Sequence, residues 1–486
     1  MEKIKQFFIT HKYILAILCV ASLVRFYKLD FQSLWMDEIY TLNVASPKHS
    51  FLQILSEVNL RESFPYLYFF IMNTLFTLFG DSSIVARFPS VIFGILAIWM
   101  IYKLGKEMLN EKAGLIAALL LTFNEYGIFH SQDARAYSLY LACLLFSYYK
   151  FVKFLKDDQP NRNLIWYAVS TGLMLNTNFF SVLNVLAQGS ILLLVLFLTP
   201  KEERTAYFKK ILKIAGIVLL FFLPNSYKFY LLSQFKSSWI PAPSNDGLTN
   251  IMKEFISNSE ILVFLYGLLF TFFIIKVFSQ KQTKNLKQLL ENKLVLAYLV
   301  LFSWISFVVV VILLKSYLSS SLYVSRYFIS IFPAILLMIS IALASFRNLF
   351  VRYSFLLLLV FFVIFDLVVV KKYYHTPLKS QYREATDMVR FYNPKKEVIY
   401  TSLKYWMDFY LNNNGVAFEV VDKPNLLAVV NEMKTNPAMI KSFWVVDGYA
   451  DIVKLPPAEQ QFLDAHFTLQ ESYDGLGAIT RHYVKK

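Results

Sequence analysis

Long apolar stretches separated by short polar connections run from residue 10 to residue 370. Eleven of them come close to, or reach, the roughly 20 residues that an α-helix needs to cross a bilayer. They lie at 10–28, 86–104, 112–130, 137–155, 163–179, 181–199, 208–224, 259–279, 293–314, 323–345 and 351–370. This pattern predicts an α-helical polytopic membrane protein with about eleven transmembrane helices.

A further apolar run, PYLYFFIMNTLFTLF at residues 65–79, is shorter than the others. As a helix it would be about 22 Å long, less than the roughly 30 Å of a hydrocarbon core. Lys and Arg concentrate on cytoplasmic loops, and in this chain they gather on one set of connections only if 65–79 does not cross. We therefore expect an interfacial helix in the first outer loop, with the N-terminus inside and the C-terminus outside.

The pattern changes after residue 371, where apolar runs become shorter and charges more frequent. Strands are expected at 397–401, 416–421, 442–447, 468–473 and 478–484, and helices at 404–413, 425–436 and 457–467. Strands that alternate with helices indicate an α/β fold. The sequence thus predicts a transmembrane domain over 1–371 and a small outer-face α/β domain over 372–486.

The composition agrees with a membrane protein, because 57% of the residues are hydrophobic and the mean hydropathy is +0.49. The formal net charge of +15 fits basic cytoplasmic loops, and no basic patch belongs to a nucleic-acid-binding motif. Nucleic acid is therefore excluded as a partner. The two cysteines, Cys19 and Cys143, lie in apolar runs and have no metal-ligand spacing.

Four groups of polar residues are expected at the outer bilayer surface. They come from LWMDEIY (34–40), RESFPYLYF (61–69), HSQDARAY (130–137) and KSYLSSSLYVSRYF (315–328). The residues of these groups that could take part in catalysis or binding are Asp37, Glu38, Arg61, Glu62, His130, Asp133, Arg135, Lys315, Arg326 and Tyr327.

This set of residues suits the use of a sugar carried on a polyprenyl phosphate. The lipid tail of such a donor stays in the bilayer, and its phosphate lies at headgroup depth. Arg135 and Arg326 are candidates to hold the phosphate and the charge it gains as the sugar leaves. Asp37 is the candidate general base that takes the proton of the acceptor.

Each group also has a structural interpretation. The Asp37–Glu38 pair could be a hydrated loop, and arginines near helix ends are often interfacial anchors. The residue before Pro65 is pushed into an extended conformation, which is typical of a turn before a helix. DARAY could be a helix N-terminus with its favourable acid.

The order of motifs resembles a known family. After the acid pair come a proline before an apolar helix ending in LFG, then ARFPSVIFG (86–94), SQDARAYSL (131–139) and SRYFISIFP (325–333). This order is similar to that of the bacterial GT-C glycosyltransferases related to protein O-mannosyltransferases and to the lipid A aminoarabinose transferase. The resemblance covers roughly residues 10–345.

The resemblance implies an inverting transfer of a hexosyl or pentosyl group from a polyprenyl-phosphate donor on the outer face of the cytoplasmic membrane. The acceptor would be a glycan, lipid or protein. Asp37 matches the family's first-loop acid, with Glu38 beside it, and Asp133 matches a second acid. Asp37 and Asp133 are also candidate ligands for Mg²⁺ or Mn²⁺, and the sequence leaves the need for a cation open.

The resemblance further places Arg135, Arg326 and the adjacent Tyr327 near the donor phosphate, with Arg61, Glu62 and His130 as secondary contacts. One departure concerns the residues before the interfacial helix, where the family often has HPP or KPP and this chain has Ser63-Phe64-Pro65. The missing basic group argues against an aminoarabinose transferase or a true protein mannosyltransferase.

Two other functions compete with the enzyme. A transporter or flippase for lipid-linked sugars would show polar or broken helices at mid-membrane, whereas the predicted spans are nearly free of charge. A membrane scaffold would use 372–486 as a binding domain, and this region has no evident catalytic motif. We expect the region to hold the acceptor or cover the active site.

Overall fold

The computed structural model describes residues 2–156, 160–234, 240–244, 246–280, 285–412, 417–448 and 455–486. The chain divides into two compact units. The first comprises Met1–Tyr27 and Val44–Lys372, and the second comprises Lys28–Asn43 and Tyr373–Lys486.

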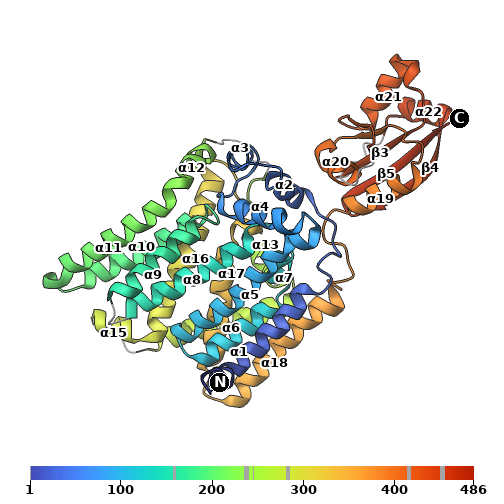
Figure 1. The fold of residues 1–486 in the computed structure, drawn as a ribbon. Helices are drawn as coiled ribbons and strands as arrows, with labels where there is room; N and C mark the ends of the chain where they lie inside the picture. Colours follow the sequence, from blue (N-terminus) through green and yellow to red (C-terminus); the bar gives the residue numbers. More distant parts are fainter. Residues whose placement is uncertain are drawn as a thin grey trace. The chain divides into compact units, whose positions relative to one another are not determined.

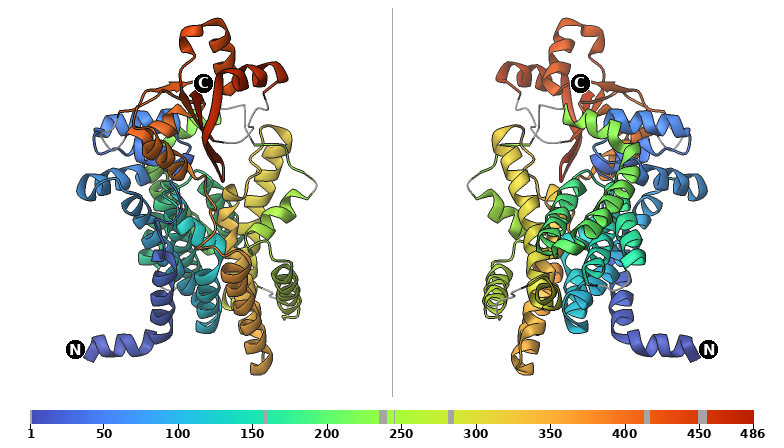
Figure 2. Two further views of the ribbon diagram at one scale, coloured as in Figure 1. Left: turned by 90° about the vertical axis from the view of Figure 1, so that its right-hand side faces the viewer. Right: turned by 90° about the vertical axis from the view of Figure 1, so that its left-hand side faces the viewer.

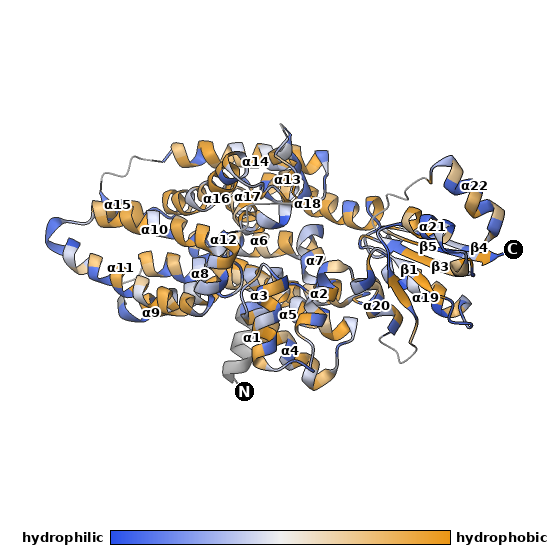
Figure 3. Ribbon diagram, turned by 90° about the horizontal axis from the view of Figure 1, so that it is seen from above, coloured by the Kyte–Doolittle hydropathy of each residue, from blue (hydrophilic) through white to orange (hydrophobic). Residues whose placement is uncertain are grey.

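The first unit is a bundle of helices that are apolar along most of their length (Figures 1 and 3). Its helices are α1 (Glu2–Phe26), α3 (Phe51–Arg61), α4 (Leu67–Phe79), α5 (Ser83–Met108), α6 (Glu111–Phe123), α7 (Glu125–Ser131), α8 (Tyr137–Lys156), α9 (Pro160–Leu175), α10 (Ser181–Leu198), α11 (Lys201–Phe222), α12 (Ser226–Ser233), α13 (Gly247–Glu254), α14 (Glu260–Phe278), α15 (Leu286–Glu291), α16 (Lys293–Leu318), α17 (Phe332–Ser345) and α18 (Leu349–Phe365). Helices α3 and α4 lie at the end of the bundle opposite to the N-terminus (Figure 2).

Every predicted apolar stretch contains a helix, but the helices differ in length. Among the described residues, six helices are long and apolar enough to cross a bilayer, and the bent pair of α6 and α7 would make a seventh. The number eleven therefore stays a prediction. Helix α4 has only 13 residues, in line with a segment too short to span.

The stretch 112–130, expected to be one continuous helix, is broken. Helices α6 and α7 meet at an angle of 68°. Asn124 starts the second helix, because its side chain accepts a hydrogen bond from the backbone N–H of Gly127 at 2.9 Å. A second bond from its amide to the carbonyl of Phe255, 2.7 Å long, fixes the break.

The buried Arg25, at the end of α1, satisfies the carbonyls next to this break. Its guanidinium donates to the carbonyl oxygens of Leu121 and Thr122, both at 3.0 Å, and to the hydroxyl of Ser131 at 3.1 Å. Backbone groups away from water need partners. Arg25 therefore stabilises the bend by supplying them.

A hydrogen-bonded seam joins α8, α9 and α10. The hydroxyls of Ser147 and Thr171 lie 2.9 Å apart, Gln188 donates to Ser147 at 3.0 Å, and Tyr167 donates to Gln188 at 3.1 Å. Such bonds between buried polar side chains hold helices together where no water is available.

The second unit is an α/β domain built on a five-stranded sheet of order β2-β1-β3-β5-β4. Strands β1, β2 and β3 are parallel, and β5 pairs antiparallel with β3 and β4. Its elements are α2 (Met36–Val44), α19 (Tyr382–Tyr392), β1 (Ile399–Thr401), α20 (Lys404–Asn412), β2 (Val420–Asp422), α21 (Leu426–Thr435), β3 (Phe443–Gly448), α22 (Pro457–His466), β4 (Phe467–Gly475) and β5 (Ala478–Lys485).

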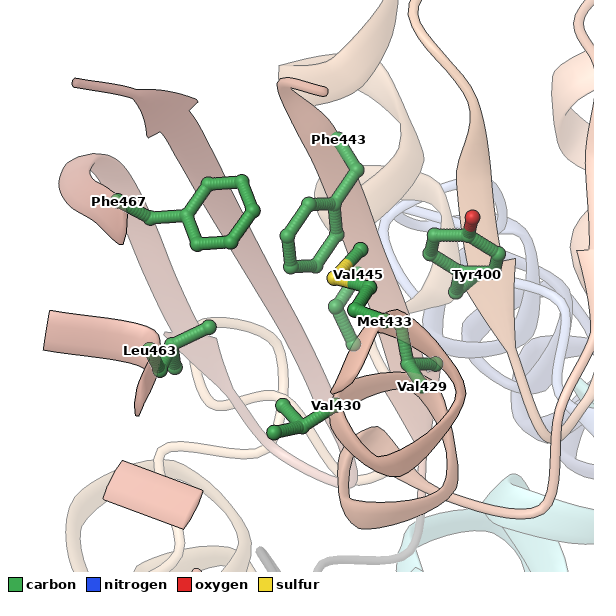
Figure 4. Packing of buried hydrophobic residues seen from close by; sticks show 8 residues of the cluster. All are labelled: Tyr400, Val429, Val430, Met433, Phe443, Val445, Leu463 and Phe467. Atoms are coloured by element: carbon green, nitrogen blue, oxygen red, sulfur yellow. The ribbon is translucent and has the colours of Figure 1, made fainter. Parts of the chain in front are cut away.

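The core of this domain lies between the sheet and the helices α21 and α22 (Figure 4). Met433 and Val429 of α21 face Phe443 and Val445 of β3, and Leu463 comes from α22. All predicted strands and helices of this region are present within the described residues. Helix α19 was not predicted.

Residues 28–43 group with the α/β domain, whereas the sequence analysis assigned them to the transmembrane domain. The reason lies in their hydrogen bonds. Gln32 donates to the carbonyl of Thr376 at 3.0 Å, and Arg383 donates to the carbonyls of Asp30 and Phe31 at 3.0 and 2.8 Å.

We expect Arg25→Leu to lower the free energy of unfolding by about 3 kcal/mol or more, because it removes charge-assisted hydrogen bonds and leaves buried carbonyls without donors. Thermal unfolding in detergent micelles measures the loss. Arg162→Leu, which replaces an exposed arginine of α9, should change the midpoint little. Equal losses in both variants would contradict the role given to Arg25.

Candidate functional site

The most tightly bound pair among the predicted residues is Glu62 with Arg135. Glu62 follows the last residue of α3, and Arg135 lies between α7 and α8. The two terminal nitrogens of Arg135 donate to the two carboxylate oxygens of Glu62 at 2.7 and 2.8 Å, and both side chains are buried. Parallel bonds of this kind are the strongest that an arginine makes with a carboxylate.

Phe64 covers this pair. The guanidinium of Arg135 lies 4.9 Å from the centre of the Phe64 ring, within the range of a cation–π contact. Phe64 also packs edge-on against Tyr137, with ring centres 5.5 Å apart. The motif Ser63-Phe64-Pro65 thus places an aromatic ring on the arginine, whereas Ser63 stands at the position where the resembling family often has a basic group.

His130 continues the aromatic contacts. Its ring centre lies 4.7 Å from that of Tyr137 and 4.5 Å from that of Tyr126. Tyr126 donates from its hydroxyl to the carbonyl of Ser325 at 3.2 Å. The wall of rings therefore reaches from Arg135 to the short helix η2 (Ser325–Tyr327).

Helix η2 carries Arg326 and Tyr327, both partly exposed. Tyr327 packs on Phe180 with ring centres 4.6 Å apart. The first unit therefore brings Glu62, Phe64, His130 and Arg135 together in one buried cluster. The wall of rings connects this cluster to the segment that holds Arg326. Asp133 is buried in the turn between α7 and α8. The backbone carbonyl of Asp133 accepts a hydrogen bond from the N–H of Arg135 at 2.7 Å.

Two other predicted residues have local partners on the surface. Arg61 forms an exposed ion pair with Glu57 at 2.7 Å, one turn earlier in α3. Lys315 is exposed and donates to the hydroxyl of Ser319 at 3.1 Å. These contacts assign neither residue to the buried cluster.

Lys228 of α12 was missed by the sequence analysis. Its buried ammonium donates to the carbonyls of Val58 and Asn59 at 2.8 and 3.0 Å, at the end of α3. Burial lowers the pKa of Lys228 to about 8, and the nearby carboxylate of Glu62 opposes this shift. In the sequence, Lys228 lies between aromatic residues just after a predicted span, which is typical of an interfacial anchor. Only the fold shows that Lys228 lies near Glu62.

The acid pair lies in the second unit, in the first turn of α2. The carboxylate of Glu38 is buried and forms an ion pair with Lys379 at 3.1 Å. Asp37 is partly exposed. Successive residues of an α-helix point about 100° apart, so one acid can be enclosed while its neighbour stays accessible.

No group of three or more His, Cys, Asp or Glu side chains in the described part of the chain is arranged to hold a metal ion. The predicted metal ligands Asp37 and Asp133 belong to different units.

A known protein family matches part of the chain in sequence. Residues 63–227 match the family described as dolichyl-phosphate-mannose-protein mannosyltransferase. No curated protein matches the chain in sequence.

Solved structures resemble the whole chain. ArnT from Cupriavidus metallidurans bound to undecaprenyl phosphate is 12% identical with a TM-score of 0.56, over 97% of this chain and 98% of that one. The archaeal oligosaccharyltransferase AglB from Archaeoglobus fulgidus, in complex with an inhibitory peptide and a dolichol-phosphate, is 12% identical with a TM-score of 0.54, over 99% and 75%. The mycobacterial arabinofuranosyltransferase AftD is 10% identical with a TM-score of 0.52, over 98% and 42%.

The chain thus has the fold of the GT-C integral membrane glycosyltransferases, as the order of its motifs indicated. Within it, residues 63–227 carry the sequence pattern of the mannosyltransferase family. This segment includes Phe64, His130 and Arg135 of the buried cluster.

We expect Glu62→Gln to lower the free energy of unfolding by about 3–5 kcal/mol, because the guanidinium of Arg135 stays buried without its counter-charge. Glu57→Gln is a matched control. It removes the acid of the exposed pair with Arg61 and should cost less than about 1 kcal/mol. Thermal unfolding in micelles compares them, and similar losses would contradict a special role for the buried pair.

A pH dependence follows from the lowered pKa of Lys228. The folded protein releases this proton near pH 8, whereas an unperturbed lysine holds it to about pH 10.5. Between these values the unfolded chain binds more protons, so the stability contribution of Lys228 rises with pH. The wild-type unfolding midpoint should therefore rise relative to that of Lys228→Met between about pH 8 and pH 10.

Parallel profiles for wild type and Lys228→Met would contradict this prediction. Lys209→Met, which replaces an exposed lysine of α11, serves as the control. Its profile should run parallel to that of the wild type.

Proposed function

We propose that this protein is an inverting glycosyltransferase that moves a sugar from a polyprenyl-phosphate donor to an acceptor on the outer face of the cytoplasmic membrane. The observation that carries the proposal is the match of residues 63–227 to the family of dolichyl-phosphate-mannose-protein mannosyltransferases. A lipid-linked donor is supported by the undecaprenyl phosphate bound to ArnT and the dolichol-phosphate bound to AglB.

In the proposed reaction Asp37 is the general base. It takes the proton of the acceptor nucleophile as that atom forms a bond with the anomeric carbon of the sugar. The bond from the anomeric carbon to the phosphate oxygen breaks on the opposite side, and its electron pair leaves with the polyprenyl phosphate. We assign this task to Asp37 because it is partly exposed, whereas Glu38 is engaged by Lys379.

The cations of the first unit are assigned to the phosphate. Arg326, with Tyr327 beside it, is partly exposed at η2, and a guanidinium there would stabilise the charge that the leaving phosphate gains. Arg135 is held by Glu62. In this proposal Arg135 contacts the phosphate after the phosphate has replaced the Glu62 carboxylate. The carboxylate of Glu62 would then interact with the nearby ammonium of Lys228.

The roles of His130 and Asp133 are less direct in this proposal. His130 belongs to the wall of rings that links Arg135 to η2. Asp133 shapes the turn that carries Arg135. In this proposal His130 would support Arg135 through Tyr137 and Phe64, and Asp133 would hold it through the backbone bond of the turn.

The proposal is tested by mass spectrometry of envelope glycans in a strain that lacks the gene. We expect one sugar to disappear and to return with the wild-type gene. Asp37→Asn, at matched amounts of membrane protein, should restore less than about 1% of it, because removal of a general base costs about 10²–10⁴ in rate. Asp30→Asn, an exposed acid in the same segment, should restore it fully.

The outcomes separate the candidate functions. Full restoration by Asp37→Asn would show that Asp37 is not the general base and would favour a membrane scaffold. Accumulation of the lipid-linked sugar on the cytoplasmic side of the deletion strain would instead favour a flippase. Loss of a sugar that depends on Asp37 supports the transferase, and the mass lost gives the sugar class.

A further inference from the structure

Helix α2, which carries Asp37, is too short to be stable alone. It has nine residues, and isolated helices of fewer than about 12 residues are marginal in water. The direction in which the Asp37 carboxylate points therefore depends on what holds α2 in place. Within the second unit, these holding contacts come from the C-terminal part of the chain.

The segment before α2 is fixed by hydrogen bonds between side chains and the backbone. The side chain of Gln32 donates to the carbonyl of Thr376 at 3.0 Å and accepts from the N–H of Leu378 at 2.9 Å. The hydroxyl of Tyr410, on α20, donates to the carbonyl of Leu34 at 3.0 Å. Side chains and backbone groups of residues 373–412 thus hold the chain from Gln32 to Leu34.

Helix α2 itself is fixed by an ion pair and by aromatic contacts. Lys379 lies 3.1 Å from the Glu38 carboxylate, and both side chains are almost fully enclosed, with exposed fractions of 2% and 0%. On the next turn, the ring of Tyr40 packs against Tyr405 at 5.3 Å and edge-on against Trp406 at 5.6 Å.

The ion pair constrains α2 more strictly than the rings do. Two charges that leave water lose several kcal/mol of hydration each, and only good pairing geometry repays the loss. Glu38 can therefore neither rotate outward nor lose Lys379 without a large cost. Because Asp37 is the adjacent residue of the same helical turn, the pair also restricts the position of the Asp37 carboxylate.

We propose that Lys379 is a positioning residue for the transfer reaction, acting through Glu38 on Asp37. The inference rests on the proposed function, in which Asp37 is the general base. It gives the C-terminal domain a task in the chemical step, beyond binding an acceptor or covering the site. The two acids then divide the work, with Asp37 taking the proton and Glu38 fixing the helix.

The test compares carrier binding with transfer. Undecaprenyl phosphate is the probe for carrier binding. Its binding to the purified full-length protein is measured as the shift that it causes in the unfolding midpoint. Transfer is the envelope sugar restored in the deletion strain at matched protein amounts. Lys379→Met should bind the probe within about twofold of wild type and restore at least tenfold less sugar. Lys379→Arg should recover most of the transfer.

Lys434→Met is the matched control. Lys434 also belongs to the second unit and pairs with Glu459 at 2.6 Å, but this pair is partly exposed. Its replacement should leave binding and transfer as in wild type. Full transfer by Lys379→Met would overturn the proposal.

A double variant covers the case in which Lys379→Met does not fold. Glu38→Met with Lys379→Met removes both buried charges, a change that proteins often tolerate. Probe binding with impaired transfer in the double variant supports positioning. Wild-type transfer, or loss of probe binding in both variants, would assign the pair to the fold alone and overturn the proposal.

Asp37→Asn, measured alongside, separates this inference from the proposed function. If Asp37→Asn transfers normally, the assignment of the base is wrong and the role of Lys379 falls with it. If Asp37→Asn is inactive while the Lys379 variants transfer normally, only the positioning role is wrong.

Discussion

A charge that lies away from water must have a partner, and this requirement explains several features of the protein. Arg25 ends α1 inside the bundle and donates to carbonyls beside the break between α6 and α7. Arg135 is buried with Glu62, and Glu38 is buried with Lys379. Each of these contacts joins segments far apart in the sequence. They therefore fix the irregular parts of the fold, where the candidate residues lie, while apolar packing holds the long helices.

The broken helix illustrates the connection between this constraint and the site. A continuous helix over 112–130 would need no side chain to satisfy its carbonyls. The 68° bend redirects α7, and α7 carries Tyr126 and His130 into the wall of rings that ends at Arg135. Arg25 stabilises the bend because two of its hydrogen bonds reach the carbonyls of Leu121 and Thr122 beside the break, and a third reaches the hydroxyl of Ser131 on α7. The position of the cluster thus depends on an arginine that is not part of it.

The helices could be predicted from the sequence because their signal is local, in length and hydropathy. The same holds for the first three strands after residue 397, each of which contains a short apolar run. Partners could not be predicted in this way, since Glu62 and Arg135 are 73 residues apart and no periodicity links them. Lys228 was missed because a single lysine at a helix end fits an interfacial anchor equally well. Residues 28–43 were assigned by their place between apolar segments, whereas side-chain bonds from Gln32 and Arg383 decide where they belong.

The acid pair shows how much a single helical turn can decide. In the sequence, Asp37 is the candidate general base and Glu38 is a secondary candidate beside it. In the structure, α2 encloses Glu38 with Lys379 and leaves Asp37 partly exposed. A base must reach its substrate, and its direction must also be held fixed, because small displacements of a reacting group reduce the rate strongly. One side chain cannot readily be both accessible and anchored. Two neighbouring acids on a short helix can meet both requirements, which gives a physical reason for their adjacency.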